Sequence, residues 1–218
     1  MADADLEAAR KRVDLIAKHL PTMISVASLG VKSKTPYLLL WPREALIWRT
    51  EELARCACDA LENGDIAAGI LLTRAVTESA AFVWRLKELI DTRHSYSEDA
   101  LRTILNRMLF GWKNDEEFPE AINVNTLIDR MDKHIPGVRA RYATLSEFAH
   151  PNWSGVAGLF SSSDRANYTT SFGRALRGHE SKKEMASALL AGSLELFEYA
   201  YNAISDALPK FIAELEPL

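Results

Sequence analysis

The chain has 218 residues, of which 48% are apolar, a composition typical of a globular protein with a sizeable hydrophobic core. The formal net charge of −4 excludes a surface that attracts nucleic acid over its whole extent. Any affinity for a polyanion must therefore reside in one part of the molecule.

The charge is distributed unevenly along the chain. Residues 137–177 contain five arginines and only two acidic residues, so this segment carries +3 while the remainder carries −7. The arginines are Arg139, Arg141, Arg165, Arg174 and Arg177. The sequence therefore predicts a basic region on an acidic body.

The two cysteines and the N-terminal residues indicate the cellular compartment in which the protein is expected. Cys56 and Cys58 lie close together in a helical pattern and point to nearly opposite sides, so neither a disulfide nor a shared metal ion is expected. Residues 1–12 are charged and lack the apolar core of a secretory signal. No segment is expected to be long and apolar enough to span a membrane. We therefore expect a cytoplasmic protein that does not interact with a membrane.

The first part of the chain is predicted to hold one helix and a connection. Residues 3–20 are charged and amphipathic, which favours a helix that ends before the following proline. Residues 21–41 contain two prolines and a glycine, which favour an irregular segment. We therefore expect an N-terminal helix with its connecting segment over 1–41, followed by a helical bundle domain over 42–218.

Two long helices are expected next. Pro42 suits the first turn of a helix that runs to about Asn63, and Gly64 suits its C-terminal cap. Asp65 is then the expected N-terminal cap of a helix over about 66–90, which is apolar over most of its circumference. A helix of this kind normally lies at the centre of a bundle.

The remainder is predicted as shorter helices, an insertion and a long last helix. Three shorter helices are expected over 97–111, 125–135 and 138–150. Residues 154–173 contain serines, glycines and aromatic residues, so a non-helical loop or short hairpin is expected there, with 163–167 as its turn. Ser181 and Glu184 have the spacing of a capping box before the last helix, which Pro209 is expected to end or kink. The predicted fold class is an all-α helical bundle with one non-helical insertion.

The stretch ARYATLSEFAHPNWSG, residues 140–155, contains the candidate site. His150 precedes a proline, which places it at the C-terminus of a helix, where the helix dipole favours a protonated ring. Glu147 lies on the same side of that helix, three residues earlier. The central helix carries three charged residues on one stripe, Arg74, Glu78 and Arg85. If the two helices cross there, the cluster is either a structural polar network or a functional site.

This stretch, together with TLIDRMDKHIPGVRARY at 126–142, resembles a group of uncharacterised bacterial helical proteins. More distantly, it resembles the HEPN superfamily (higher eukaryotes and prokaryotes nucleotide-binding). In that resemblance a helix with an Arg-x-x-x-Glu pattern, here Arg74 and Glu78, faces a later helix that ends in a His-Pro step. Many HEPN proteins are metal-independent ribonucleases of toxin–antitoxin and antiphage systems, and they are usually dimers. The resemblance implies RNA or a nucleotide as ligand, a homodimer, an antitoxin-like partner and no cofactor.

The same resemblance implies a set of site residues. As catalytic residues it implies His150 for proton transfer, Asn152 to orient the substrate, and Glu147. Supporting residues would be Arg74, Glu78, Arg85, Arg141 and Trp153. In the catalytic signature of the family a polar residue follows an arginine directly and a histidine comes shortly after. Eight residues separate Arg141 from His150, which is too many. The formal match is Arg174 with His179, in which Ala175 stands at the polar position.

Two further ligand classes follow from residue types. Glu147 and His150 have the Glu-x-x-His spacing of di-iron helical proteins, but the chain contains no second such motif, so no metal site is expected. Aromatic residues alternate with arginines in and beside the insertion: Trp153, Phe160, Arg165, Tyr168, Phe172 and Arg174. These aromatic rings either stack on the bases of single-stranded RNA or anchor the insertion to the body.

Overall fold

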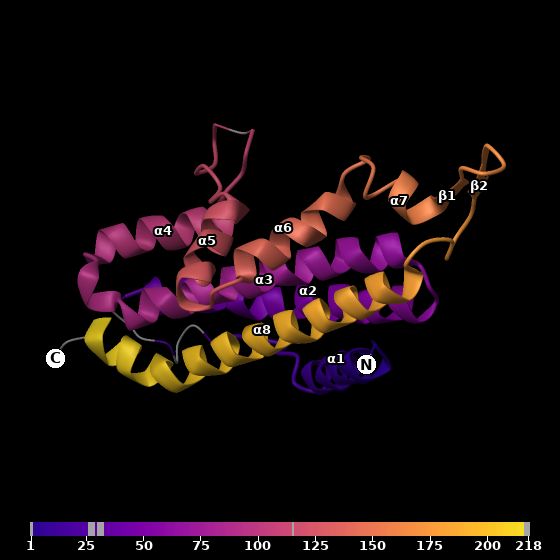
Figure 1. The fold of residues 1–218 in the computed structure, drawn as a ribbon. Helices are drawn as coiled ribbons and strands as arrows, with labels where there is room; N and C mark the ends of the chain where they lie inside the picture. The colour runs from indigo at the N-terminus through magenta and orange to yellow at the C-terminus, as the bar shows by residue number, and fades with distance from the viewer. Residues whose placement is uncertain (1, 26–28, 30–32, 115, 216–218) are drawn as a thin grey trace.

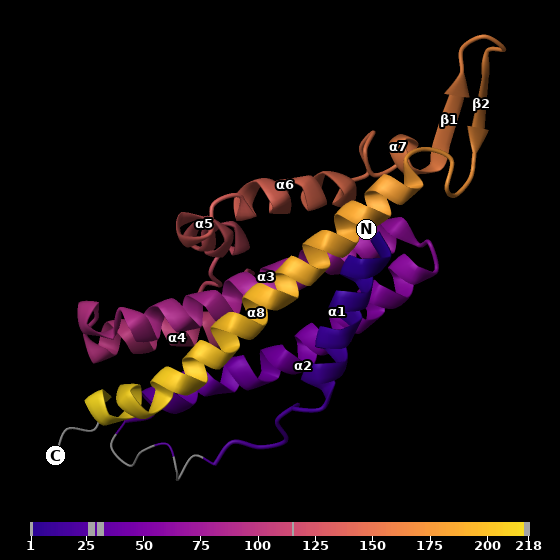
Figure 2. The same cartoon turned by 60° about the horizontal axis from the view of Figure 1, so that its bottom comes forward.

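Four long helices form the body of the molecule. The structure is a computed structural model that describes residues 2–25, 29, 33–114 and 116–215. The long helices are α1 (Ala2–Ala17), α2 (Thr35–Glu62), α3 (Ile66–Asp91) and α8 (His179–Leu215). Helices α2, α3 and α8 run along the length of the molecule, and α1 lies beside α2 and α8 (Figures 1 and 2). The predicted all-α helical bundle is confirmed.

Helix α3 is the central helix, as predicted. It contacts both α2 and α8, and most of its apolar residues are buried. Among the described residues it is the one helix long and apolar enough to cross a membrane, which corrects the expectation that no segment has these properties. Its composition follows from its position, because a helix surrounded by other helices needs apolar residues on most of its circumference.

Two prolines lie inside helices. Helix α2 begins at Thr35 and continues through Pro42, contrary to the predicted start. Helix α8 continues through Pro209, so this proline does not end it. Proline removes one backbone hydrogen bond, and the cost is offset here by burial of the flanking side chains. Those side chains include Leu39 and Leu40 in α2 and Phe211 in α8.

The N-terminal helix shares the core of the bundle. Leu6, Ala9 and Val13 of α1 are buried in the same hydrophobic cluster as the residues of the long helices. Arg10 of α1 forms an ion pair with Asp59 of α2 at 2.7 Å. The boundary expected at residue 41 falls within α2, and α1 shares one core with the helices that follow it.

The turn between α2 and α3 is closed by the expected glycine. Gly64 has a φ of 76°, and the N–H of Asp65 donates to the carbonyl of Ala60 at 2.8 Å, as in a Schellman motif. The carboxylate of Asp65 makes no capping hydrogen bond to α3. It accepts a hydrogen bond from Arg174 instead, at 2.7 Å. This contact ties the start of α3 to the segment before α8.

Three shorter helices and a short 3₁₀ turn lie on the bundle. They are η2 (Arg93–Ser95), α4 (Glu98–Phe110), α5 (Val124–His134) and α6 (Val138–Ala149). Ser97 caps α4 by accepting a hydrogen bond from the N–H of Ala100 at 3.2 Å, as its position predicts. Helices α5 and α6 both pack on α3.

The insertion contains the predicted hairpin. It is formed by β1 (Ser161–Asp164) and β2 (Thr169–Phe172), which pair antiparallel with Ser161 opposite Phe172. A short helix, α7 (Ala157–Phe160), precedes it, so the segment 154–173 is not wholly non-helical. The hairpin projects beyond the ends of the long helices (Figure 2).

Helix α8 begins three residues earlier than the capping box predicts, which with Ser181 as the cap would place the first helical residue at 182. It starts at His179, after Gly178 with a φ of 56°. The Ser181 hydroxyl donates to the carbonyl of Gly178 at 2.9 Å rather than accepting from an N–H group. The helix thus begins at the residue after the glycine, before the chain reaches the serine.

Candidate nucleic-acid interface

Helix α6 crosses the charged stripe of α3, and the side chain that meets the stripe is Tyr142. The phenol Oη donates to Glu78 Oε1 at 2.7 Å and accepts a hydrogen bond from Arg74 Nη2 at 3.0 Å. Arg74 Nε also lies 3.3 Å from the same Glu78 oxygen. Burial and the hydrogen bond to Glu78 raise the pKa of Tyr142 above its ordinary value of 10.0. The three groups satisfy one another, which is the pattern of a structural polar network between two helices.

The predicted catalytic residues lie at the other end of α6. His150 is the C-terminal cap residue, is exposed, and forms no hydrogen bond or ion pair with any described residue. It is eight residues beyond Tyr142, which is about 12 Å along the helix axis. Glu147 accepts a hydrogen bond from Asn152 Nδ2 at 3.0 Å, and Asn152 Oδ1 accepts the N–H of Gly155 at 3.0 Å. The structure therefore brings Glu147 and Asn152 together in the turn after α6 and leaves His150 away from the charged stripe of α3.

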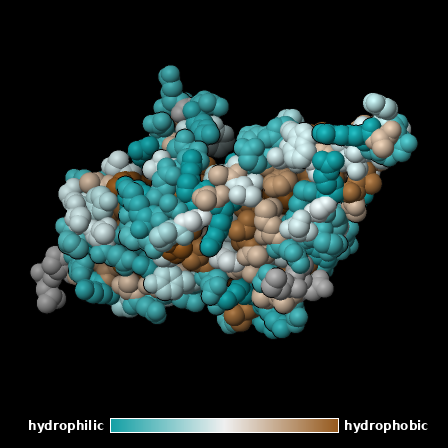
Figure 3. Space-filling model, viewed as in Figure 1, coloured by the Kyte–Doolittle hydropathy of each residue, from teal (hydrophilic) through white to brown (hydrophobic). Residues whose placement is uncertain are grey.

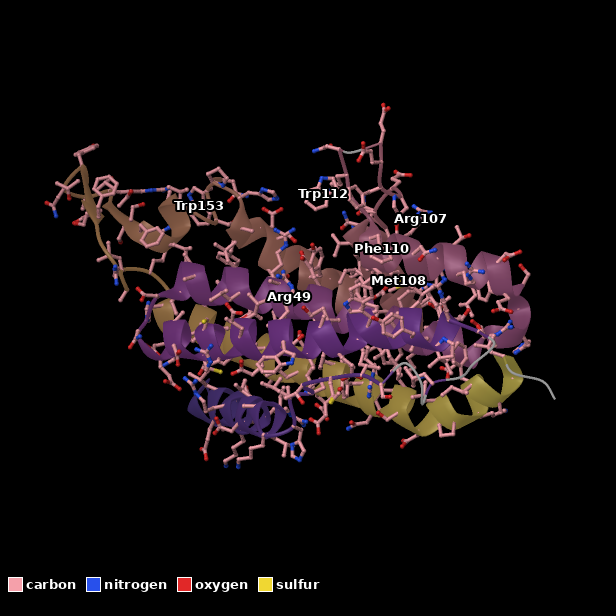
Figure 4. All side chains as sticks on the ribbon, turned by 180° about the vertical axis from the view of Figure 1, so that it is seen from behind. Arg49, Arg107, Met108, Phe110, Trp112 and Trp153 are labelled. Carbon is pink, nitrogen blue, oxygen red and sulfur yellow. The ribbon has the colours of Figure 1, made fainter. Side chains whose placement is uncertain are left out.

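The predicted supporting residues Arg85, Arg141 and Trp153 lie in three separate places. Arg85 is buried and donates to Glu88 at 2.7 Å, outside the network of Tyr142. Arg141 borders a narrow groove between α6 and α8, where hydrophobic residues show at the surface (Figure 3). Trp153 is 65% exposed in the turn before α7 (Figure 4). Trp153 lies in the same turn as His150, whereas Arg85 and Arg141 lie elsewhere.

The tip of the hairpin is held by Asp164. Its carboxylate accepts hydrogen bonds from Asn167 Nδ2 at 2.7 Å and from the N–H of Ala166 at 2.9 Å. These hydrogen bonds, with that of the Asn167 side chain the largest, lower the pKa of Asp164. Tyr168 follows with a φ of 52°. The ionised carboxylate thus stabilises one conformation of the turn at neutral pH.

The aromatic side chains of the hairpin do not anchor it to the body. Tyr168 is 96% exposed and Phe172 is 80% exposed, and neither forms a ring contact within the part of the chain that the structure describes. Phe160, at the base, is 41% exposed. Large aromatic side chains usually bury most of their surface on folding. Exposed rings beside arginines match the arrangement on which unpaired bases stack.

A cavity of about 230 Å³ lies at the base of the hairpin. Its walls come from the α2–α3 turn, the first turn of α3, α7 and residues 174–182. Arg174, Arg177, His179 and Lys182 line it, so both members of the formal Arg–His match share one cavity. The acidic residue in its wall is Asp65, which is paired with Arg174. The charged side chains of the cavity are therefore mostly cationic.

The sequence analysis missed Lys182 and the cavity that it shares with Arg174, Arg177 and His179. The run RALRGHESKK at 174–183 holds four cationic residues and a histidine around the start of a long helix, and this signal points to the cavity. Helical spacing marks Tyr142 as a core residue, and its hydroxyl partners are visible only in the packed structure. Within the described ranges no group of three His, Cys, Asp or Glu side chains is placed to hold a metal ion.

Comparison of the chain with models of protein families, with curated proteins and with solved structures found no match. Membership of the HEPN superfamily, a bacterial source, a homodimer and an antitoxin-like partner therefore stay predictions from the resemblance.

Proposed function

We propose that the chain binds single-stranded RNA through the β-hairpin and the basic residues at its base. The observation that carries this proposal is the exposure of Tyr168 and Phe172, at 96% and 80%. Stacking of a base on an aromatic ring contributes about 1–3 kcal/mol, and a base must be unpaired to stack in this way. Two exposed rings on one short hairpin thus favour a single strand over a duplex.

The distribution of charge supports contact with phosphates at this end of the molecule. Arg165 lies in the hairpin turn, and Arg174 and Arg177 follow β2. Outside residues 137–177 the chain carries −7, which repels phosphates from the rest of the surface. The proposal of RNA rather than DNA follows the HEPN resemblance.

The cluster between α3 and α6 supports the alternative that its polar residues have a structural role. Acid–base cleavage of RNA requires an imidazole and a cation at the same phosphate. His150 has no arginine partner among the described residues, whereas His179 shares its cavity with Arg174 and Arg177. A ribonuclease effector of a stress or defence system is a separate proposal, and its chemistry would reside at His179.

The test is a binding titration with fluorescently labelled RNA. A single-stranded RNA, the same sequence as a duplex, and the matching DNA strand are each titrated with the full chain and with Tyr168→Ala/Phe172→Ala. We expect the double variant to bind the single-stranded RNA at least about tenfold more weakly, because each lost stack contributes about 1–3 kcal/mol.

Trp112→Ala is the matched control, because Trp112 is 60% exposed in the segment between α4 and α5, away from Trp153 and the hairpin (Figure 4). It should bind RNA as the unmodified chain does. Absence of RNA binding by the unmodified chain, or equal losses in the control and the double variant, would contradict the proposal. Equal affinity for the DNA strand would contradict its RNA specificity.

A further inference from the structure

The cationic cavity at the base of the hairpin has more positive charge than its own residues neutralise. Arg174, Arg177 and Lys182 contribute three positive charges, and Asp65 contributes the one carboxylate of the lining. That carboxylate is already paired with Arg174 at 2.7 Å. Neither Arg177 nor Lys182 lies within ion-pair distance of a carboxylate in the described ranges.

The two unpaired cations are held close to each other. Lys182 Nζ donates a hydrogen bond to the backbone carbonyl of Arg177. Burial and the charge of Arg177 lower the pKa of Lys182. An anion between these side chains would relieve their repulsion and would itself be bound by both.

The backbone around the cavity adds to this preference for an anion. The cavity is lined by Ile66, Ala67 and Ala68 in the first turn of α3, and by His179 at the start of α8. The amide groups of a first helical turn have no intrahelical acceptor, and the helix dipole is positive at this end. Two long helices thus direct their N-termini toward the same cationic side chains.

The remaining wall is apolar. Leu159 and Phe160 of α7 and Ile66 of α3 also line the cavity. Its volume of about 230 Å³ is slightly below the range of about 300–1,000 Å³ that is usual for small-molecule sites. A cavity lined by both cationic and apolar side chains suits a small ligand that has both characters.

We propose that this cavity binds the phosphate monoester of a nucleotide. The phosphate lies before Arg177, His179 and Lys182, and the nucleoside lies against Leu159 and Phe160. The nucleotide is either free or the terminal residue of an RNA strand. Binding of a strand terminus rests on the function proposed above, whereas binding of a free nucleotide does not.

The first experiment is calorimetric titration of the full chain with adenosine 5′-monophosphate, uridine 5′-monophosphate, adenosine and inorganic phosphate. We expect both nucleotides to bind at least about tenfold more tightly than adenosine, because adenosine lacks the charge, and more tightly than inorganic phosphate, which lacks the apolar contact. Failure of both nucleotides to bind at millimolar concentration would overturn the proposal. Equal affinity for adenosine would do so as well.

The second experiment locates the site. Arg177→Ala/Lys182→Ala should weaken nucleotide binding at least about tenfold, because both unpaired cations are removed. The control is Arg49→Ala/Lys113→Ala, which removes the same charge from two exposed residues outside the cavity. An equal loss in the control, or an unchanged affinity in the first double variant, would show that the cavity is not the site.

The third experiment separates the two sources of the nucleotide and the two proposals. If the cavity takes a strand terminus, RNA with a 5′- or 3′-phosphate should bind at least about tenfold more tightly than the same RNA with two hydroxyl ends. Equal affinities for all three strands would exclude the terminus and leave the free nucleotide. Tyr168→Ala/Phe172→Ala should bind free nucleotide normally. An unmodified chain that binds free nucleotide but no RNA would therefore refute only the hairpin proposal.

Discussion

Two regions of the molecule contain the same kinds of side chain. One is the crossing of α3 and α6, where these side chains are hydrogen-bonded to one another, and the other is the hairpin, where they are exposed. At the crossing, Arg74, Glu78 and Tyr142 are joined by hydrogen bonds of 2.7 to 3.0 Å. At the hairpin, Tyr168 and Phe172 are exposed, and their rings contact no other ring of the described chain. Charged and aromatic groups that satisfy one another inside the protein stabilise its fold. Groups that lack such partners are available to a ligand.

The largest expected effect is a difference in stability between variants of two tyrosines, one at each region. Tyr142→Ala should reduce the free energy of unfolding by about 3–5 kcal/mol, because it removes a side chain that is only 3% exposed. Tyr168→Ala should change it by less than about 0.5 kcal/mol, because that side chain is 96% exposed. Urea denaturation followed by circular dichroism measures both. A similar loss in the two variants would remove the distinction between the regions.

A smaller effect tests the hydroxyl of Tyr142 by itself. Tyr142→Phe keeps the ring but leaves Glu78 and Arg74 without their shared partner. We expect a loss of about 1–2 kcal/mol in the free energy of unfolding, since these groups are only partly exposed to water. RNA affinity should not change. If stability is unaffected, the network does not contribute to the packing of α6 on α3.

The alkaline pH dependence of stability offers a further test of the same hydroxyl. The pKa of Tyr142 is raised in the folded chain above the ordinary value of 10.0, so the folded state retains this proton longer than the unfolded state. The contribution of the protonated Tyr142 hydroxyl to stability is fully present below about pH 10 and is lost as the pH rises through the pKa of the folded state. Denaturation at a series of pH values from 8 upward should show a shallower decline for Tyr142→Phe than for the unmodified chain. Identical slopes would contradict the raised pKa.

The smallest effect is expected at the predicted catalytic histidine. His150→Ala should change the free energy of unfolding by less than about 0.5 kcal/mol, because the side chain is exposed and has no partner in the described chain. The affinity for RNA should stay within about twofold of that of the unmodified chain. Such a change is well below the roughly 1.4 kcal/mol that corresponds to a tenfold change in affinity. RNA cleavage that disappears in this variant, with stability retained, would instead support the catalytic role implied by the HEPN resemblance.

Helical periodicity was sufficient to predict the fold class and the central helix. The apolar circumference of residues 66–90 predicts a core helix, and α3 is one. Gly64 and Ser97 were predicted at helix ends because their local chemistry suits those positions, and both lie there. The starts of α2 and α8 were predicted wrongly. In α2 the turns before Pro42 are held by buried side chains, among them Leu39 and Leu40. Helix α8 begins directly after Gly178, whose positive φ precedes the serine.

The sequence by itself determined the helical class, the order of the longer helices and the place of the insertion, because each depends on neighbours along the chain. Only the tertiary structure decided which side chains meet. Tyr142, rather than Glu147 or His150, reaches the stripe of α3, since the position at which two helices cross depends on the packing of both. The cavity likewise unites Asp65 with residues 174–182, which are far apart in the sequence and meet because two helices start at the same end of the bundle.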